Sequence, residues 1–228
     1  MSYAERFKLI AVVIGSTGLV GSEVIKALFA RPDVEKVKSF VRRPSQTENL
    51  PGSEKLEEHI VDFAKVETWK KLLIGDALFS CLGTTRSQAG SKAAQYTVDY
   101  QYQLDVARMA KEWGVQTYIL ISSIGADANS PFFYLKMKGQ LERDVETLGF
   151  AKTRILRPAP LKGRHGSRLG EQLGIRVLEL ALPLFPKGLK EHLRPVEART
   201  VAEIAVRSAF KEHLGTLVYD SANIRLDK

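Results

Sequence analysis

The sequence has very little cysteine. Cys81 is the only one among 228 residues, so the chain can form no intrachain disulfide. Lack of a disulfide framework is typical of a reducing compartment. Because Cys81 lies in the apolar run 77–82, we interpret it as a buried core thiol rather than a nucleophile. One cysteine cannot complete a zinc site, and the histidines lack ligand-like spacing, so we expect no metal. The four histidines are His59, His165, His192 and His213.

Long hydrophobic runs are missing as well. No segment approaches the roughly 18 consecutive apolar residues of a membrane-spanning helix. Residues 1–8 are mixed in charge and lack the charged, apolar and small-residue zones of a secretory signal. We therefore expect a cytoplasmic protein without a membrane span.

Runs of like charge are also absent, although the net charge is +8. Scattered basic residues favour a solvated surface with a few cations for an anionic cofactor, and they disfavour nucleic acid as a partner. Hydrophobic residues make up 44% and charged residues 26% of the chain, a balance that argues against disorder. We expect a small-molecule substrate, and we leave a protein partner and the oligomeric state open.

Strand-like and helix-like segments alternate along the chain. This pattern predicts a Rossmann-like α/β fold, a doubly wound parallel sheet with helices on both faces. The expected strands cover residues 8–14, 34–41, 56–61, 77–82, 117–123, 153–156 and 216–219. The expected helices cover 18–30, 66–74, 91–113, 132–148, 175–185 and 201–210, and 42–53 is expected to be a loop. We expect a single domain over 1–228, in which about 161–228 contribute a small substrate-side lobe.

A glycine-rich turn joins the first expected strand to the first expected helix. Gly15 permits a tight turn, Gly18 lets the backbone approach a pyrophosphate, and Gly21 lets the helix pack closely on the strand. The helix N-terminus then offers free N–H groups to the phosphates. The alternative is a structural turn capped by Ser16 or Thr17. The expected phosphate-binding residues are Gly15, Ser16, Thr17, Gly18, Leu19, Val20 and Gly21.

The end of the second strand indicates which dinucleotide is preferred. A site for NAD usually has an acidic residue there, which bonds the ribose 2′-hydroxyl. This chain has Arg42 and Arg43 instead. Guanidinium groups can bind a 2′-phosphate that a carboxylate would repel, so the pair favours NADP(H). The alternative is a pair of solvated arginines at a strand end.

Tyr134 and Lys138 lie four residues apart and therefore share one face of the expected helix. A cation beside a phenol favours the phenolate and suits it to acid–base chemistry. Ser123 ends the preceding strand and can hold a substrate oxygen. These three residues are the candidate catalytic group. The alternative is that Tyr134 merely packs.

Together these motifs resemble the short-chain dehydrogenase/reductase superfamily. The segments Cys81–Arg86, Ser122–Asp127 and Tyr134–Gly139 more narrowly resemble its atypical, Tat-interacting-protein-like group, as does Arg157-Pro158 followed by Leu161. The similarity spans about residues 8 to 165.

The resemblance implies further roles. It implies that Ser123 orients a carbonyl, that Tyr134 is the general acid–base and that Lys138 also bonds the nicotinamide ribose. It places Asp62 and Phe63 beside the adenine. Along the middle of the cofactor and near its nicotinamide, it places Leu82, Gly83, Thr84 and Pro158.

The sequence departs from the superfamily at one position. Many members have an asparagine that serves a proton relay in the helix after the fourth strand, and the nearest match here is Asp99. The leading hypothesis is an NADP(H)-dependent oxidoreductase acting on a carbonyl or alcohol. The alternative is an NADPH-binding sensor that interacts with proteins, which the change at Asp99 favours slightly.

Overall fold

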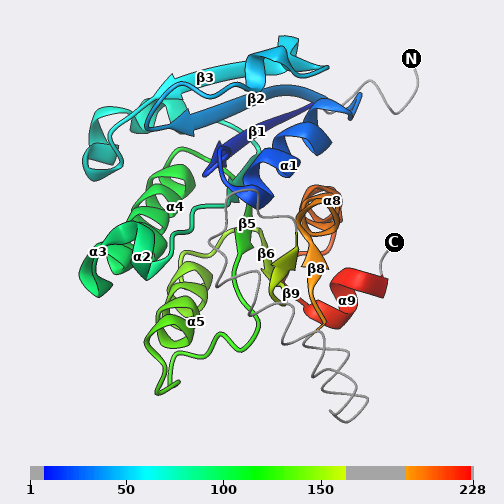
Figure 1. Cartoon of the computed structure of the whole chain (residues 1–228). Coiled ribbons are helices and arrows are strands. Elements are labelled where there is room, and N and C mark those ends of the chain that lie inside the picture. Colours follow the sequence, from blue (N-terminus) through cyan, green and yellow to red (C-terminus); the bar gives the residue numbers. More distant parts are fainter. Residues whose placement is uncertain (1–7, 163–193, 227–228) are drawn as a thin grey trace.

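A seven-stranded sheet forms the centre of the molecule in the computed structural model, which describes residues 8–162 and 194–226 (Figure 1). Its strand order is β3-β2-β1-β4-β5-β6-β9, and every neighbouring pair is parallel, so the predicted fold class is confirmed. The strands are β1 (Leu9–Ile14), β2 (Val34–Val41), β3 (Leu56–Ile60), β4 (Ala77–Ser80), β5 (Thr117–Ile121), β6 (Lys152–Arg157) and β9 (Gly215–Asp220). A short parallel pair, β7 (Leu161–Lys162) and β8 (Val196–Glu197), lies beside it.

Helices cover both faces of this sheet (Figure 1). On one face, α1 and α8 lie side by side. They pack on every second residue of the strands, such as Val13 and Phe79, and form one hydrophobic core with them. On the other face, α4 and α5 enclose a second core around Val12 and Leu78. Adjacent strand residues therefore point into different cores, which explains why these strands read as continuous apolar runs. The helices are α1 (Leu19–Phe29), α2 (Arg86–Ala89), α3 (Lys92–Tyr96), α4 (Tyr102–Glu112), α5 (Phe133–Glu146), α8 (Ala198–Ala209) and α9 (Ser221–Leu226).

Two expected helices differ from the prediction. The segment predicted as a helix over 66–74 forms two 3₁₀ turns, Phe63–Thr68 and Lys70–Leu73, interrupted by a non-helical Trp69. The Trp69 side chain explains the break, because its ring stacks on Phe40 and its indole donates a 2.9 Å hydrogen bond to the carbonyl of Asp62. A tertiary contact has overridden helical periodicity.

The helix predicted over 91–113 is also not continuous. It divides into α3, a π-helical turn at Thr97–Gln101, and α4. The predicted loop 42–53 contains 3₁₀ turns at Thr47–Asn49 and near Ser53. The expected segment 175–185 lies outside the described residues.

The junction of β1 and α1 sets the position of the first helix. Gly15 has φ +80°, and a Cβ there would lie 2.5 Å from the backbone nitrogen of Leu82. A Cβ on Gly21 would lie 2.1 Å from the carbonyl oxygen of Gly15. Only glycine permits both approaches, so the turn packs against the segment after β4, and α1 packs against the turn.

We predict that Gly21→Ala lowers the free energy of unfolding by about 1–3 kcal/mol, because the methyl group must displace backbone rather than a flexible side chain. Urea denaturation of the purified protein measures it. Gly83→Ala is the matched control, since nothing lies within 4 Å of a Cβ at that position, and it should change stability by less than about 0.5 kcal/mol. Equal stability of the two variants would contradict this account of the junction.

Candidate functional site

The predicted site residues follow directly after the carboxyl ends of the strands. Gly15 follows β1, Arg42 follows β2, and the segment that begins at Cys81 follows β4. Ser123 comes two residues after β5, and Pro158 follows β6. Because the strands are parallel, these ends share one edge of the sheet. The order of the strands reverses between β1 and β4, the place where doubly wound sheets form a ligand crevice.

The N-terminus of α1 faces this edge without a side-chain cap. Gly18 is the N-cap residue, it is exposed, and no acidic residue lies in the first turn. Ser16 is buried and its hydroxyl accepts a 2.7 Å hydrogen bond from Ser39 on β2, so it holds the turn and does not cap the helix. Thr17 is exposed, Leu19 is half-buried and Val20 packs in the core.

This arrangement fits the diphosphate of a dinucleotide. An uncapped helix N-terminus presents unpaired N–H groups and a partial positive charge, and a glycine lets an anion approach the backbone closely. The capped structural turn considered above is not the arrangement seen, because no side chain caps α1.

Arg42 and Arg43 are exposed where β2 ends. Neither guanidinium forms a hydrogen bond or ion pair with any described residue, so both remain available to an anion. Asp62 is exposed and its carboxylate accepts a 3.0 Å hydrogen bond from the N–H of Ala64. Phe63 is buried with its ring against Trp69, so its side chain belongs to the core.

The loop after β4 is fixed by a buried carboxylate. The N–H of Thr84 donates a 2.7 Å hydrogen bond to Asp99, and Gln95 donates a 3.2 Å bond to the Thr84 carbonyl. Leu82 is half-buried and Gly83 is exposed. Asp99 itself is fully buried on the π-helical turn, which packs against α5. It therefore connects the expected cofactor loop to the helix that carries Tyr134 and Lys138.

Burial raises the pKa of Asp99 above its usual value, and the positive charge of Lys138 partly offsets the rise. The same two causes act on Cys81, where burial raises the pKa to about 12 against the effect of Lys138. The thiol therefore stays protonated near neutral pH, which is not the state of a nucleophile. The ammonium of Lys138 on α5 therefore lies near Cys81, which follows β4, and near Asp99 on the π-helical turn.

Tyr134 and Lys138 occupy different environments although they lie one helical turn apart. Tyr134 is 39% exposed, whereas Lys138 is 3% exposed and its ammonium donates a 3.4 Å hydrogen bond to the carbonyl of Ile121. Ser123 lies two residues beyond that carbonyl and is half-buried. Tyr134 can therefore present its hydroxyl to a ligand, and the buried ammonium belongs to a residue one turn further along the same helix.

A buried ionic clamp joins three parts of the site, and the sequence reasoning missed it. Glu142 on α5 accepts hydrogen bonds from the Ser122 hydroxyl and from the guanidinium of Arg157. The carboxylate of Glu142 raises the pKa of Arg157. Ser122 precedes Ser123, Arg157 precedes Pro158, and Glu142 lies one turn after Lys138. The four-residue spacing from Lys138 and the arginine before the proline were the available signals.

Within residues 8–162 and 194–226, every helix is too short or too polar to span a bilayer. The same residues contain no group of three or more acidic, histidine or cysteine side chains that could hold a metal ion. His165 and His192 lie outside these ranges.

Comparison with known proteins places the chain among dinucleotide-binding proteins. A family model described as NAD(P)H-binding matches residues 15–173. The protein FMP52-1, mitochondrial, of Scheffersomyces stipitis is 38% identical over 209 residues, which is 87% of each chain. The protein FMP52, mitochondrial, of Candida albicans is 35% identical over 210 residues and 90% of each chain.

Solved structures show the same fold at low identity. The 3-oxoacyl-[acyl-carrier protein] reductase of Brucella melitensis, in complex with NAD, has a TM-score of 0.73 at 16% identity, covering 96% of this chain and 98% of its own. The ADP-L-glycero-D-manno-heptose-6-epimerase of Helicobacter pylori has a TM-score of 0.67 at 18% identity, covering 96% and 79%. These similarities show a Rossmann-type fold.

The expected cytoplasmic location is wrong, because the names of these relatives contain the word mitochondrial. The lack of a secretory signal in residues 1–8 does not bear on import into mitochondria, because the segments that direct this import differ from secretory signals in composition.

The family model covers well over half of the chain, and the fungal relatives align along nearly all of it. The protein therefore belongs to the NAD(P)H-binding family, together with the FMP52 proteins, and it is an NAD(P)-binding protein with a Rossmann-type fold.

Proposed function

We propose that this protein is an NADP(H)-dependent oxidoreductase that interconverts a carbonyl and an alcohol, and that it works in mitochondria. The observation that carries the enzymatic proposal is the pairing of an accessible Tyr134 with a buried Lys138 at the edge of the sheet to which the glycine turn belongs. The names of its relatives support the location. The nicotinamide, when bound, supplies or takes the hydride.

The residues of the chain handle the proton and the substrate oxygen. In the reductive direction, Ser123 donates a hydrogen bond to the carbonyl oxygen, and Tyr134 transfers its hydroxyl proton to that oxygen as the carbon gains the hydride. The phenolate that remains regains a proton from solvent. Lys138 is proposed to supply a positive charge one helical turn away during this transfer, and the same ammonium is a candidate partner for the nicotinamide ribose. Residues 161–228, apart from α8, which packs beside α1, are proposed to contribute the substrate side of the site.

Arg42 and Arg43 are proposed to bind the 2′-phosphate that distinguishes NADP(H) from NAD(H). Their support is that both are exposed beside the glycine turn and have no anionic partner among the described residues. Along the cofactor, the remaining proposed contacts are Asp62, Phe63, Leu82, Gly83, Thr84 and Pro158. For Phe63 only the backbone is proposed to make contact, because its ring is buried.

A second candidate is an NADPH sensor that does not turn over. The observation that favours it is Asp99, a buried carboxylate at the position matched to the relay asparagine. A sensor would bind NADPH with the same residues and would convert none of a broad panel of aldehydes and ketones.

Replacing Tyr134 with phenylalanine should lower the rate of carbonyl reduction by about 10²- to 10⁴-fold, because the variant has no hydroxyl proton to transfer. The NADPH dissociation constant should stay within about twofold. NADPH oxidation followed by absorbance and calorimetric titration measure the two quantities. Tyr96→Phe serves as the matched control. Unchanged turnover in Tyr134→Phe would remove this residue from the mechanism.

Alanine at Arg42 or Arg43 should weaken NADPH binding by about 10- to 100-fold, as expected for losing a hydrogen bond between charged groups. Binding of NADH should change little, since it has no 2′-phosphate. Calorimetric titration of both nucleotides gives the ratio, with Arg108→Ala, on the surface of α4, as the control. If the affinities for NADPH and NADH fell equally, the arginines would not be the residues that bind the 2′-phosphate.

Asp99→Asn should stabilise the protein without ligand at neutral pH. Because burial raises the folded-state pKa of Asp99, the folded state holds its proton more tightly than the unfolded state. The contribution of Asp99 to stability is therefore present below the unfolded pKa of about 3.9 and is lost as pH rises toward the higher folded value. The stability gained by the variant should grow across that interval and then stay constant.

Urea denaturation at a series of pH values measures this difference, and NADPH titration reports on the Thr84 loop in the same variant. Asp105→Asn, on the half-exposed side of α4, is the matched control. A stability difference that does not change with pH would mean that Asp99 ionises as it does in the unfolded chain.

A further inference from the structure

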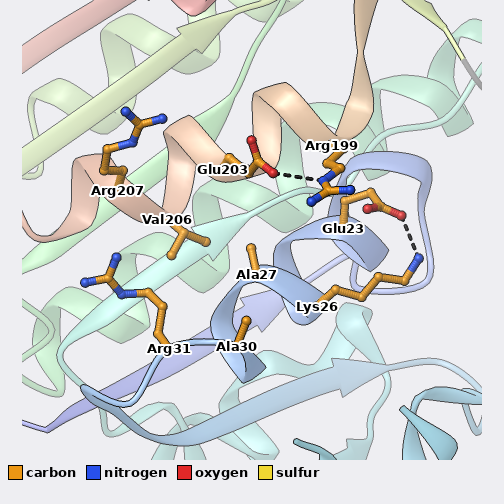
Figure 2. A pocket seen from close by; sticks show the side chains of 9 residues that line it. All are labelled: Glu23, Lys26, Ala27, Ala30, Arg31, Arg199, Glu203, Val206 and Arg207. Atoms are coloured by element: carbon orange, nitrogen blue, oxygen red, sulfur yellow. Dashed lines mark hydrogen bonds and ion pairs between the residues drawn. The ribbon is translucent and has the colours of Figure 1, made fainter. Parts of the chain in front are cut away.

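A groove of about 640 Å³ lies between α1 and α8, apart from the dinucleotide site (Figure 2). The two helices run side by side on one face of the sheet, and none of the proposed catalytic or cofactor-binding residues lines the groove. The lining residues belong to α1, to the two residues that follow it, and to α8. They are Glu23, Lys26, Ala27, Ala30, Arg31, Arg199, Glu203, Val206 and Arg207.

The floor of the groove is formed by small side chains. Ala27, Ala30 and Val206 lie between the charged walls (Figure 2). Small residues let another backbone approach closely, and two adjacent helices leave a groove into which the ridge of a third helix can pack. The shape therefore fits a helical segment better than a free ion, which would gain nothing from an apolar floor.

The charges of the walls are not balanced. Four cationic side chains line the groove and only two carboxylates do. At one end both carboxylates are satisfied within their own helices, where Lys26 pairs with Glu23 at 2.7 Å and Arg199 pairs with Glu203 at 2.9 Å. Figure 2 shows Arg31 and Arg207 at the opposite end, one on each side.

Arg31 is held rigidly at that end. Its Nε donates a 2.8 Å hydrogen bond to Asp33, and its guanidinium lies 3.9 Å above the ring centre of Phe210. The same guanidinium lowers the pKa of Asp33. Arg207 is exposed and has no hydrogen bond or ion pair with any residue that the structure describes. Of these two guanidinium groups only that of Arg31 has a carboxylate partner, so the Arg207 guanidinium can attract another carboxylate.

We propose that this groove is a docking site for a helical segment of a protein partner, one that presents an acidic side chain to Arg31 and Arg207. Small apolar side chains on the same face of that helix would pack on Ala27, Ala30 and Val206. The proposal does not rest on the oxidoreductase function, because it uses the outer surface of α1 and none of the residues assigned to chemistry.

The test uses a fluorescein-labelled, alanine-rich helical peptide with glutamates along one face, and a matched peptide with glutamines in their place. Fluorescence anisotropy should show the wild-type chain binding the glutamate peptide at least about tenfold more tightly than the glutamine peptide, with the preference falling as salt rises. Amide resonances of Ala27, Ala30 and Val206 should shift on addition of the glutamate peptide.

Two variants locate the binding. Arg207→Glu should abolish the preference for glutamate, and it should fold normally because Arg207 has no partner among the described residues. Ala30→Trp fills the groove without changing charge, and it should weaken binding of the glutamate peptide by at least about tenfold. Lys71→Glu and Ala64→Trp are the matched controls on the opposite face of the sheet, and each should bind both peptides as the wild type does.

Three results would overturn the proposal. One is equal binding of the two peptides by the wild-type chain, and another is no binding of either. The third is a preference for glutamate that survives both Arg207→Glu and Ala30→Trp, which would place the acidic peptide on another part of the basic surface. NADPH binding and carbonyl reduction should be the same in Arg207→Glu as in the wild type, so loss of docking and loss of the proposed enzymatic function are separable.

Discussion

The close contact of three backbone segments at the end of β1 is the constraint on which the site depends. The turn at Gly15 lies against the backbone after β4, and Gly21 on α1 lies against the carbonyl of Gly15. No side chain other than hydrogen fits at either point, so the helix is fixed relative to two strands at once. Its free N–H groups consequently lie at the switch point of the sheet, where an anion from a dinucleotide can reach them.

Buried charge is the second requirement of this site, and it opposes stability. Asp99, Lys138 and Glu142 are all inside the protein at the edge where the strands end. Burying ionised groups carries a desolvation cost that their hydrogen bonds offset only in part. Each of these side chains nevertheless holds a segment of the proposed site. Asp99 holds the loop at Thr84, Glu142 holds the residues before Ser123 and Pro158, and Lys138 lies between them. Burial raises the pKa of Asp99, and a carboxyl group perturbed in this way is typical of functional sites.

Most of the architecture could be predicted from the sequence because it depends on local signals. Each of these signals is contained in a short stretch of sequence. They are the apolar runs, the glycines at 15, 18 and 21, and the spacing of Tyr134 and Lys138. The failures involve contacts between distant parts of the chain. Trp69 breaks an expected helix because it reaches Phe40 and Asp62, and the clamp around Glu142 needs side chains from β5, α5 and β6. Periodicity cannot reveal either, since both depend on which elements become neighbours.

The two faces of the sheet are proposed to have different roles, and α1 to take part in both. The face covered by α4 and α5 supplies the residues proposed for proton transfer, whereas the face covered by α1 and α8 carries the groove. The N-terminus of α1 is proposed to hold the diphosphate, and its outer side forms one wall of the groove. A bound dinucleotide that stiffens this short helix would reduce the ordering cost for a partner that docks along it, and by linkage such a partner would tighten the dinucleotide by the same factor. The fold therefore connects dinucleotide binding at the N-terminus of α1 with docking along the side of the same helix.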